Sequence, residues 1–540
     1  MIEDFDKCTG NATYAADVCI VGGGAAGITL SRDLAKSGLD VCLLESGGLD
    51  YDARIQELAR GTSCGYTYYD LEESRLRFFG GTTSIWGGRC AQLDRIDFER
   101  RPWVEHSGWP FGKDAIAPYY ARAQRDFDLA EMDGSDAAWK EHGLGRPPFD
   151  RDEIATSFWQ FDLAADRFAQ ARCRDVIDSP KIKVVLHATV INIQANADGT
   201  AIDRLDIANL RGGRGEARGK IYVLAAGGLE VPRLLLASNG VHPNGLGNGY
   251  DVAGRYFMEH PHARGGHIVT TDVWTTLRLL PRSYSYRGHR YAALARPGEA
   301  LQRREGALNS SFTISARQPP DEKMTLTKHV YMRLRKELNP NRGNRILWHL
   351  NRRFLLAARE FVGPHIGWSQ VKRGSHGLYM VVRAEQAPNP QSRVVLSDER
   401  DSLGMRRLVL DWRMSPIDKR TVQVATGALD RELKRMGLGR VERVPWLEDD
   451  GPLWQSDPLV SNHPIGGFHH MGTTRMGQSP RDSVVDADCR VHGIGNLYIA
   501  GSSVFPTSGW ANPTMTILAL AHRLGDHLTA RWKAFSRARR

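Results

Sequence analysis

Three glycines and one acid near the start of the sequence have the spacing of a nucleotide-binding turn. Gly22, Gly24 and Gly27 satisfy the pattern G-x-G-x-x-G, and Glu45 follows the last glycine by 18 residues. Glycines at these positions allow a tight turn, close approach of the backbone to a pyrophosphate, and close packing of a helix on a strand. The helix N-terminus would bind the phosphates, and a carboxylate at position 45 could accept both ribose hydroxyls. The pattern predicts dinucleotide binding, and it fits FAD and NAD equally well.

A second glycine cluster, at 79–88, could receive a large planar group. The stretch reads Phe-Gly-Gly-Thr-Thr-Ser-Ile-Trp-Gly-Gly, so its main chain could lie flat against such a group; an ordinary glycine loop is the alternative. Glycine is in excess overall, with 55 in 540 residues, which is about 10% against a usual ~7%. The clusters lie at 22–27, 80–88, 211–214 with 227–228, 240–248, and 466–513.

The elements that must position these residues begin with a strand–helix–strand unit. Residues 17–21 are an apolar run of strand length, residues 28–36 have a helical pattern, and residues 39–45 form a second apolar run. These lengths suit two parallel strands and their crossover helix. Residues 51–170 look irregular and are expected to be an excursion from the sheet. Further strands are expected at 184–186, 190–193, 221–226, 378–382, 393–396 and 496–500, with helices near 345–362 and 514–528.

The composition is that of an ordinary globular protein. Apolar residues make up 41% and charged residues 25%, which excludes disordered, collagen-like and coiled-coil chains. No stretch approaches the roughly 18 uninterrupted apolar residues of a membrane helix, and the first residues lack the basic and apolar regions of a secretion signal. The seven cysteines are scattered without a C-x-x-C pair, which argues against a disulfide framework and a metal site. A cytoplasmic protein without a metal ion is therefore expected.

The net charge of +10 is concentrated in two segments. Residues 328–373 carry eleven Lys or Arg and two Glu, and residues 527–540 carry five Lys or Arg and no acid. A nucleic-acid protein would show a recognisable module or a basic face interleaved with aromatic residues, and neither is present. We expect a solvated basic surface; an acidic protein partner or a membrane surface is the alternative.

Motifs in the middle and near the C-terminus complete a family pattern. They are Leu-Ala-Ala-Gly-Gly-Leu-Glu at 224–230, His-His-Met-Gly-Thr-Thr-Arg-Met-Gly at 469–477, Val-Asp-Ala-Asp-Cys-Arg-Val at 485–491, Ala-Gly-Ser-Ser-Val-Phe-Pro-Thr at 500–507 and Ala-Asn-Pro-Thr-Met-Thr at 511–516. With the two glycine clusters, and in this order, they resemble the glucose–methanol–choline oxidoreductases, which are FAD enzymes. Within that family they resemble the branch of pyranose oxidases and bacterial glucoside 3-dehydrogenases. The resemblance covers essentially the whole chain.

The resemblance implies an α/β fold with two interleaved units. One is a discontinuous Rossmann-like FAD-binding domain, and the other is an α+β substrate-binding domain built on an antiparallel sheet. The expected FAD-binding parts are 1–95, 171–264 and 456–540. Residues 265–455 would form the substrate-binding domain, and 96–170 an excursion or lid that contributes to it.

The resemblance also assigns the cofactor positions. A histidine that precedes the tryptophan in covalent pyranose oxidases is replaced here by Ile85, which cannot form the bond, so non-covalent FAD is expected. The positions expected to bind FAD are Gly22, Gly24, Ala26, Gly27, Glu45, Ser46, Gly80, Gly81, Thr82, Ser84, Trp86, Gly87, Gly88, Val190, Ala226, Gly227, Gly501, Ser502, Asn512, Pro513 and Thr514.

Oxidation of an alcohol requires a base that takes the hydroxyl proton while hydride leaves the carbon. Histidine suits this role because it is neutral near pH 7. By the resemblance, His469 is the base, and Asn512 holds the substrate oxygen without ionising. His470 is the rival; if 468–471 is extended, adjacent side chains point to opposite faces, so only one of the two reaches the flavin.

Substrate contacts are less well defined by the sequence. His470, Glu385 and Gln386 are candidates, and Glu385-Gln386 and the stretch 259–262, Glu-His-Pro-His, match stretches seen in this branch. Either stretch could line the pocket or have a structural role.

The sequence thus predicts FAD-dependent oxidation of CH–OH to C=O on a sugar, glycoside or similar polyol. Alternatives are a non-sugar alcohol or natural-product intermediate, or a non-redox lyase reaction on the same fold. The electron acceptor would be oxygen, a quinone or a separate electron-transfer protein, since the chain has no haem-attachment motif C-x-x-C-H.

Overall fold

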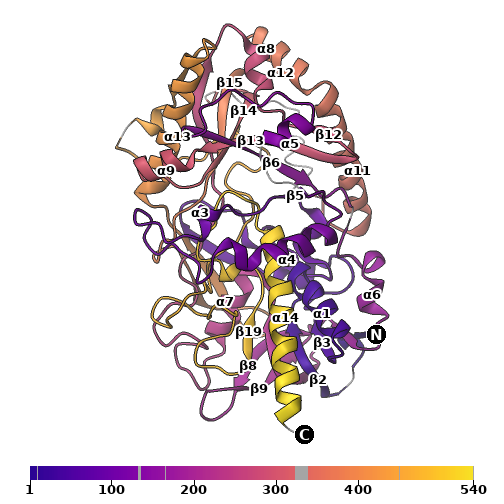
Figure 1. Cartoon of the computed structure of the whole chain (residues 1–540). Coiled ribbons are helices and arrows are strands. Elements are labelled where there is room, and N and C mark those ends of the chain that lie inside the picture. The colour runs from indigo at the N-terminus through magenta and orange to yellow at the C-terminus, as the bar shows by residue number, and fades with distance from the viewer. Residues whose placement is uncertain are drawn as a thin grey trace.

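Two large β-sheets organise the computed structural model of the chain (Figure 1). The structure describes residues 1–8, 10–131, 136–164, 166–320, 322, 338–448 and 450–538. The lower half of Figure 1 holds the first sheet, both chain termini and the long C-terminal helix α14 (Thr514–Ala538). The upper half holds the second sheet.

The first sheet contains eight described strands in the order β1-β7-β3-β2-β10-β9-β8, with β19 also pairing to β10. All pairs are parallel except β10–β9 and β9–β8. The strands are β1 (Ile2–Asp4), β2 (Ala12–Val21), β3 (Val41–Leu44), β7 (Ile182–Leu186), β8 (Thr189–Ala195), β9 (Ile202–Ala208), β10 (Arg214–Leu224) and β19 (Leu497–Ile499). They come from widely separated parts of the sequence, so the sheet is discontinuous along the chain.

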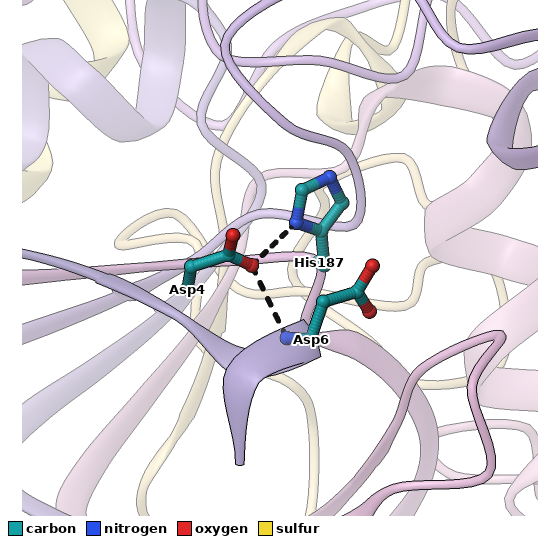
Figure 2. Close-up of side chains that lie close together, drawn as sticks. All are labelled: Asp4, Asp6 and His187. Atoms are coloured by element: carbon teal, nitrogen blue, oxygen red, sulfur yellow. Dashed lines mark hydrogen bonds and ion pairs between the residues drawn. The ribbon is translucent and has the colours of Figure 1, made fainter.

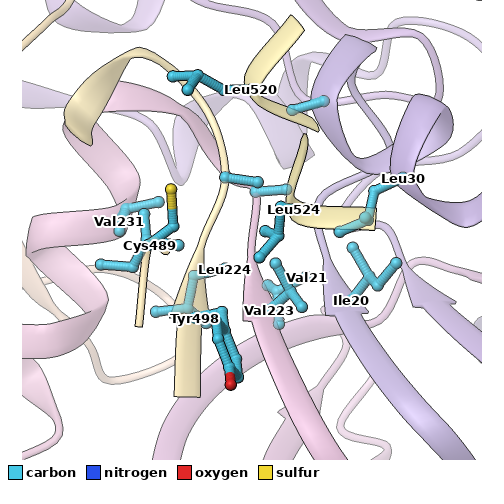
Figure 3. Packing of buried hydrophobic residues seen from close by; sticks show 14 of the residues in the cluster. Ile20, Val21, Leu30, Val223, Leu224, Val231, Cys489, Tyr498, Leu520 and Leu524 are labelled. Atoms are coloured by element: carbon cyan, nitrogen blue, oxygen red, sulfur yellow. The ribbon is translucent and has the colours of Figure 1, made fainter. Parts of the chain in front are cut away.

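The predicted strand–helix–strand unit is present as β2, α1 (Ala25–Lys36) and β3. Its apolar residues belong to the core formed by the sheet and its helices, a cluster that includes Ile20 of β2, Leu224 of β10 and Leu524 of α14 (Figure 3). The helix α14 packs against both α1 and α4 (Lys113–Asp126). The helix α1 is therefore packed between strands β2 and β3 and the C-terminal helix.

The second sheet contains eight described strands and is antiparallel in every pair. Its strands are β5 (Arg89–Cys90), β6 (Ile154–Phe161), β11 (His262–Val269), β12 (Tyr284–Tyr286), β13 (His289–Pro297), β14 (Ser311–Arg317), β15 (Gly377–Arg383) and β18 (Arg440–Arg443). The helix α13 (Pro416–Arg435) packs against β11 and β13. The predicted fold class, a Rossmann-like sheet with a second antiparallel sheet, is confirmed.

A third, small sheet and several helices complete the fold. A three-stranded sheet joins β4 (Gly61–Gly65), β16 (Arg393–Arg400) and β17 (Arg406–Trp412). The other described α-helices are α2 (Ala53–Glu57), α3 (Arg95–Phe98), α5 (Asp136–Glu141), α6 (Arg174–Ile177), α7 (Gly227–Ala237), α8 (Val273–Arg278), α9 (Glu299–Glu305), α11 (Arg342–Phe361) and α12 (Gly363–Lys372). No helix in the described part of the chain is both long enough and apolar enough to cross a membrane.

The expectation that 51–170 is irregular is wrong for two long elements. The segment contains the 14-residue helix α4 and the strand β6. β6 pairs with β13 from Ile154, opposite Pro297, to Gln160, opposite Tyr291. Both elements are stabilised by partners far away in sequence, which a local pattern does not reveal. The exact boundaries of the two units remain a prediction.

The basic segment 328–373 contains a helix whose polar side faces inward. Residues 323–337 lie outside the described residues. In α11, Arg345, His349 and Arg352 are buried, whereas Leu350 and Phe354 are 59% and 69% exposed. Part of the positive charge of this segment is therefore used inside the protein and does not form a solvated surface.

Candidate active site

A cavity of about 1670 Å³ extends from the first glycine cluster to the C-terminal motifs. It is larger than the roughly 300–1000 Å³ of an ordinary small-ligand pocket, which leaves room for a dinucleotide and a substrate together. Of the positions predicted to bind FAD, all line this cavity except Gly27 and Ser84. The cavity therefore unites residues from the whole length of the chain.

The turn between β2 and α1 has the geometry that its glycines predict. Gly22 has φ of +108°, and a Cβ atom there would lie 2.7 Å from the carbonyl oxygen of Ala225. A Cβ atom at Gly27 would overlap the carbonyl oxygen of Gly22. Gly27 thus serves helix packing behind the cavity wall, while Gly24, the N-cap of α1, faces open space.

Glu45 follows β3 and reaches across to the same turn. Its carboxylate accepts hydrogen bonds from the backbone N–H of Gly23, at 2.8 Å, and of Gly47, at 2.9 Å. Burial raises the pKa of Glu45. Glu45 and Ser46 both line the cavity, so a dinucleotide fits with its phosphates at the N-terminus of α1 and a ribose near Glu45.

The second glycine cluster forms another wall of the cavity. Gly80 and Gly88 both have positive φ, +102° and +71°, and flank a short 3₁₀ turn at Gly81–Ile85. Ser84 is buried behind this wall, and its carbonyl oxygen accepts a hydrogen bond from His349 Nε2 at 3.0 Å. Ile85 and Trp86 line the cavity.

His469 and Asn512 meet at the other end of the cavity. Asn512 Nδ2 lies 3.1 Å from His469 Nε2, although 43 residues separate the two in sequence. The other ring nitrogen, His469 Nδ1, lies 2.8 Å from Nδ1 of His260. His260 also lines the cavity, so the structure adds a second histidine to the predicted pair.

A chain of hydrogen bonds fixes the protons of these histidines. His260 Nε2 lies 2.8 Å from the carbonyl oxygen of Gly509, which can only accept, so this nitrogen carries the proton. Burial lowers the pKa of His260 to about 4, so at neutral pH its Nδ1 is an acceptor. His469 Nδ1 must then donate, and the lone pair of His469 is left on Nε2, beside Asn512.

Glu259 holds the loop that carries His469. Its buried carboxylate accepts the backbone N–H groups of His469, Gly467 and His260, and the hydroxyl of Tyr68 donates to it at 2.7 Å. Burial raises the pKa of Glu259. A Cβ atom at Gly467 would lie 2.5 Å from the His469 ring, so the glycine before the histidine pair lets the ring pack against its own loop.

His470 has different partners from His469. Its Nε2 lies 3.0 Å from the hydroxyl of Tyr68, and burial lowers its pKa to about 3. Phe468 has φ of +60°, so 468–471 is not a continuous extended strand. Both histidines line the cavity, but among the described contacts His469 is the one that pairs with Asn512.

Glu385 and Gln386 do not reach the cavity. Glu385 is fully buried in an ion pair with Arg101, and Gln386 accepts hydrogen bonds from the backbone N–H of Glu259 and the indole of Trp412. Gln386 therefore supports the loop of Glu259 from behind. The sequence identifies the stretch 259–262 as a candidate. That this stretch lies next to His469 follows only from the packing of 259–262 against the loop that carries His469.

Away from the cavity, three potential metal ligands lie together: Asp4, Asp6 and His187 (Figure 2). Asp4 Oδ1 lies 2.7 Å from His187 Nδ1 and accepts the backbone N–H of Asp6 at 3.1 Å. The hydrogen bond to His187 contributes to lowering the pKa of Asp4. These contacts tie the start of the chain to the loop after β7.

Comparison with known proteins places the chain among flavin enzymes. Residues 17–354 match the model of FAD dependent oxidoreductases, and residues 388–521 match the GMC oxidoreductase model. The chain is 25% identical to 2-methyl-1,2-propanediol dehydrogenase of Mycolicibacterium austroafricanum, covering 96% of this chain and 95% of that protein.

The chain is also 23% identical to the fructose dehydrogenase large subunit of Gluconobacter japonicus, and the match covers 96% of this chain and 98% of that protein. The structure of pyridoxine 4-oxidase from Mesorbium loti has the same fold, with a TM-score of 0.57 and 18% identity, covering 95% of this chain and 99% of the other. With its FAD-binding turn, its large cavity and these matches, the chain belongs to the glucose–methanol–choline family of FAD-dependent oxidoreductases.

Proposed function

We propose that this protein oxidises an alcohol carbon of a sugar, glycoside or similar polyol to a carbonyl, with His469 as the base. The observation that carries the proposal is the hydrogen-bond chain Gly509–His260–His469–Asn512. This chain puts the lone pair of His469 on Nε2, inside the cavity. Relatives that act on fructose and on a propanediol, by their names, support a polyol substrate. When bound, FAD supplies the hydride acceptor.

His469 and Asn512 have different roles in the proton transfer. A substrate hydroxyl that displaces the hydrogen bond of Asn512 Nδ2 from His469 Nε2 donates its proton to that nitrogen as the C–H bond breaks. Asn512 Nδ2 donates a hydrogen bond to the same oxygen and stabilises its developing negative charge without ionising. Burial, and then the neighbouring histidines, lower the pKa of His469 well below its usual value, so the base is neutral at pH 7 and ready to accept.

Non-covalent attachment of FAD is part of the proposal. The residues that would hold it are the turn at 22–27, Glu45, the 80–88 loop and the segment 501–514, all of which reach the cavity. Ile85 lines the cavity where a covalent attachment would need a nucleophilic side chain. Denaturation with acid should therefore release free FAD into the supernatant.

The choice of electron acceptor and the compartment are also proposals. Oxygen, a quinone and a separate electron-transfer protein all remain compatible with the site. A cytoplasmic location is supported by the seven cysteines, all of which are free. The alternative of a non-redox lyase reaction predicts that no alcohol reduces the flavin.

The test is anaerobic mixing of the holoenzyme with a panel of sugars, glycosides and polyols, followed by flavin absorbance. At least one compound should bleach the flavin, and His469→Ala should slow that reduction by roughly 10²–10⁴-fold while FAD stays bound. His242→Ala is the matched control, because His242 contacts the carbonyl of Gly199 and does not line the cavity. Unchanged reduction by His469→Ala would refute the assignment of the base.

A further inference from the structure

Eight arginines line a second cavity that opens beside the catalytic one, and five of them repel one another electrostatically. This second cavity has a volume of about 1000 Å³. The five, here called the arginine cluster, come from strands β5, β14 and β15, the loop before β12, and helix α11: Arg89, Arg282, Arg317, Arg359 and Arg383. Two of them, Arg89 and Arg383, line the catalytic cavity as well.

Three members of the cluster, Arg89, Arg282 and Arg383, form no ion pair with a carboxylate in the described part of the structure. Among the described residues that line the second cavity, Glu360 is the one carboxylate, and it is already bound to Arg290 and Ser285. Burial, and then the neighbouring arginines, lower the pKa of Arg383 to about 9 and of Arg89 to about 10. The guanidinium groups of the cluster repel one another. Arg89 and Arg383 nevertheless remain charged at neutral pH.

Two of the guanidinium groups are held in place but keep unused donors. Arg89 and Arg383 both lie over the ring of Trp159, with centroid distances of 5.5 and 5.3 Å. Such stacking fixes a guanidinium and leaves its in-plane N–H groups available. Arg89 Nε and Arg383 Nη1 are buried and have no hydrogen-bond partner among the described residues. Buried donors of this kind are costly unless a ligand pairs with them.

The cluster lies within reach of a substrate bound at His469. Arg383 is directly opposite His262 in the pairing of β15 with β11. His262 is two residues after His260, or about 7 Å along an extended chain, and His260 contacts His469. A sugar whose hydroxyl meets His469 can therefore place another substituent among the arginines.

We propose that the second cavity binds the oxyanion groups of a negatively charged sugar or polyol, a carboxylate or a phosphate ester. Arginine suits this role because its planar fork pairs with two oxygens of either group. Because Arg89 and Arg383 both keep unused donors and have no acidic partner among the described residues, they favour a ligand with more than one negative charge. The inference rests on the proposed alcohol oxidation and narrows its substrate to an anionic one.

The test is calorimetric titration of the oxidised, anaerobic holoenzyme with D-glucarate and D-sorbitol. These two compounds share a carbon skeleton, but glucarate has carboxylates at both ends. Inorganic pyrophosphate serves as the phosphate probe, since bound FAD already occupies the dinucleotide site. We expect glucarate or pyrophosphate to bind at least tenfold more tightly than sorbitol, and Arg383→Gln and Arg89→Gln each to weaken that binding about tenfold.

Arg54→Gln is the matched control, because Arg54 is exposed and lines neither cavity. Removal of one repelling charge should leave the melting temperature of the Arg383→Gln variant unchanged or raised, so a folded variant is expected. The proposal is overturned if neither anion binds more tightly than sorbitol, or if both arginine variants bind like the control.

The same titration in a His469→Ala background separates the two proposals. Anion binding should persist there, because His469 contacts no member of the cluster in the described structure. If His469→Ala abolishes flavin reduction while the arginine variants bind anions normally, the oxidation stands and the anion site falls. If the anions bind through the arginines but no compound ever reduces the flavin, the binding site stands without the proposed reaction.

Discussion

At the scale of residues, the chemistry depends on the positions of three protons. The first proton lies on His260 Nε2, which donates to the carbonyl oxygen of Gly509. The second lies on His469 Nδ1, which donates to His260 Nδ1. The third belongs to the amide of Asn512, which donates to His469 Nε2. Each step follows from which atoms can only accept or only donate. The base is thus oriented by a backbone carbonyl two contacts away.

The first prediction at this scale concerns pH. Because the pKa of His469 is held well below its usual value of 6.5, the base stays unprotonated, and hence active, as the pH falls through 6.5. The acidic limb of the kcat/KM profile should therefore appear below pH 6.5. Steady-state kinetics with a substrate found in the bleaching screen measures this. A limb at or above 6.5 would show that His469 is not the group that titrates.

The second prediction concerns His260, a positioning residue. His260→Leu removes the acceptor for His469 Nδ1–H, so kcat should fall roughly tenfold or more, but by less than in His469→Ala. It also removes a neighbour that lowers the pKa of His469, so the acidic limb should shift to higher pH.

His260→Gln supplies the control for that variant. Its amide can accept from His469 and donate to Gly509, so it should recover part of the lost kcat and move the limb back. If Leu and Gln variants have equal rates and equal pH profiles, His260 serves packing alone.

The sequence reveals some of these residues and conceals others for a physical reason. His469 and Asn512 stand in short motifs, so their pairing can be predicted. His260 lies 209 residues from His469, and its role depends on which nitrogen faces a carbonyl after folding. Arg89 and Arg383 sit in separate strands of the second sheet and come together at Trp159 through strand pairing, which neither stretch encodes locally.

At the scale of elements, local patterns succeed where an element carries its own signal. The β2-α1-β3 unit has apolar strands, a glycine turn and a helix of suitable length, and the structure matches it. β6 and α4 have no such local signal. The orientation of α11 is also invisible locally, since an amphipathic pattern does not say which face turns inward; here Arg352 donates to the carbonyls of Trp86 and Asp162.

The prediction at this scale tests the close approach of α1 to β2. In Gly27→Ala the added methyl group collides with the carbonyl oxygen of Gly22, so the turn must open. We expect a loss of about 1–3 kcal/mol in the free energy of unfolding and weaker FAD retention, seen in the ratio of flavin to protein absorbance.

Gly112→Ala is the control for that substitution, because a Cβ atom there meets nothing within 4 Å and φ is −83°. Because Ala is a poorer N-cap than Gly, the variant should lose up to about 1 kcal/mol of unfolding free energy, but it should retain FAD normally, since Gly112 does not line the cavity. Normal FAD retention by Gly27→Ala would show that the turn tolerates the displacement and that the close approach is not what positions the cofactor.

At the scale of the whole molecule, one cavity joins segments from both ends and the middle of the chain. Its walls include the turn at 22–27, the 80–88 loop, Ala226 and Gly227, and the segment 501–514. A ligand that contacts all of these binds the folded chain and not the unfolded one. Cofactor binding should therefore stabilise the entire fold, not just one loop.

The last prediction follows from that linkage. Protein stripped of FAD should melt at a lower temperature, and added FAD should restore stability by about 2.7 kcal/mol at a hundredfold excess over its Kd. FMN, which lacks the adenosine half expected near Glu45 and Gly24, should restore less. Differential scanning calorimetry against FAD and FMN concentration measures both effects. Because the cavity walls span the sequence, a single transition should move as a unit; a split transition with one FAD-insensitive part would mean that a large portion of the chain folds independently of the cofactor.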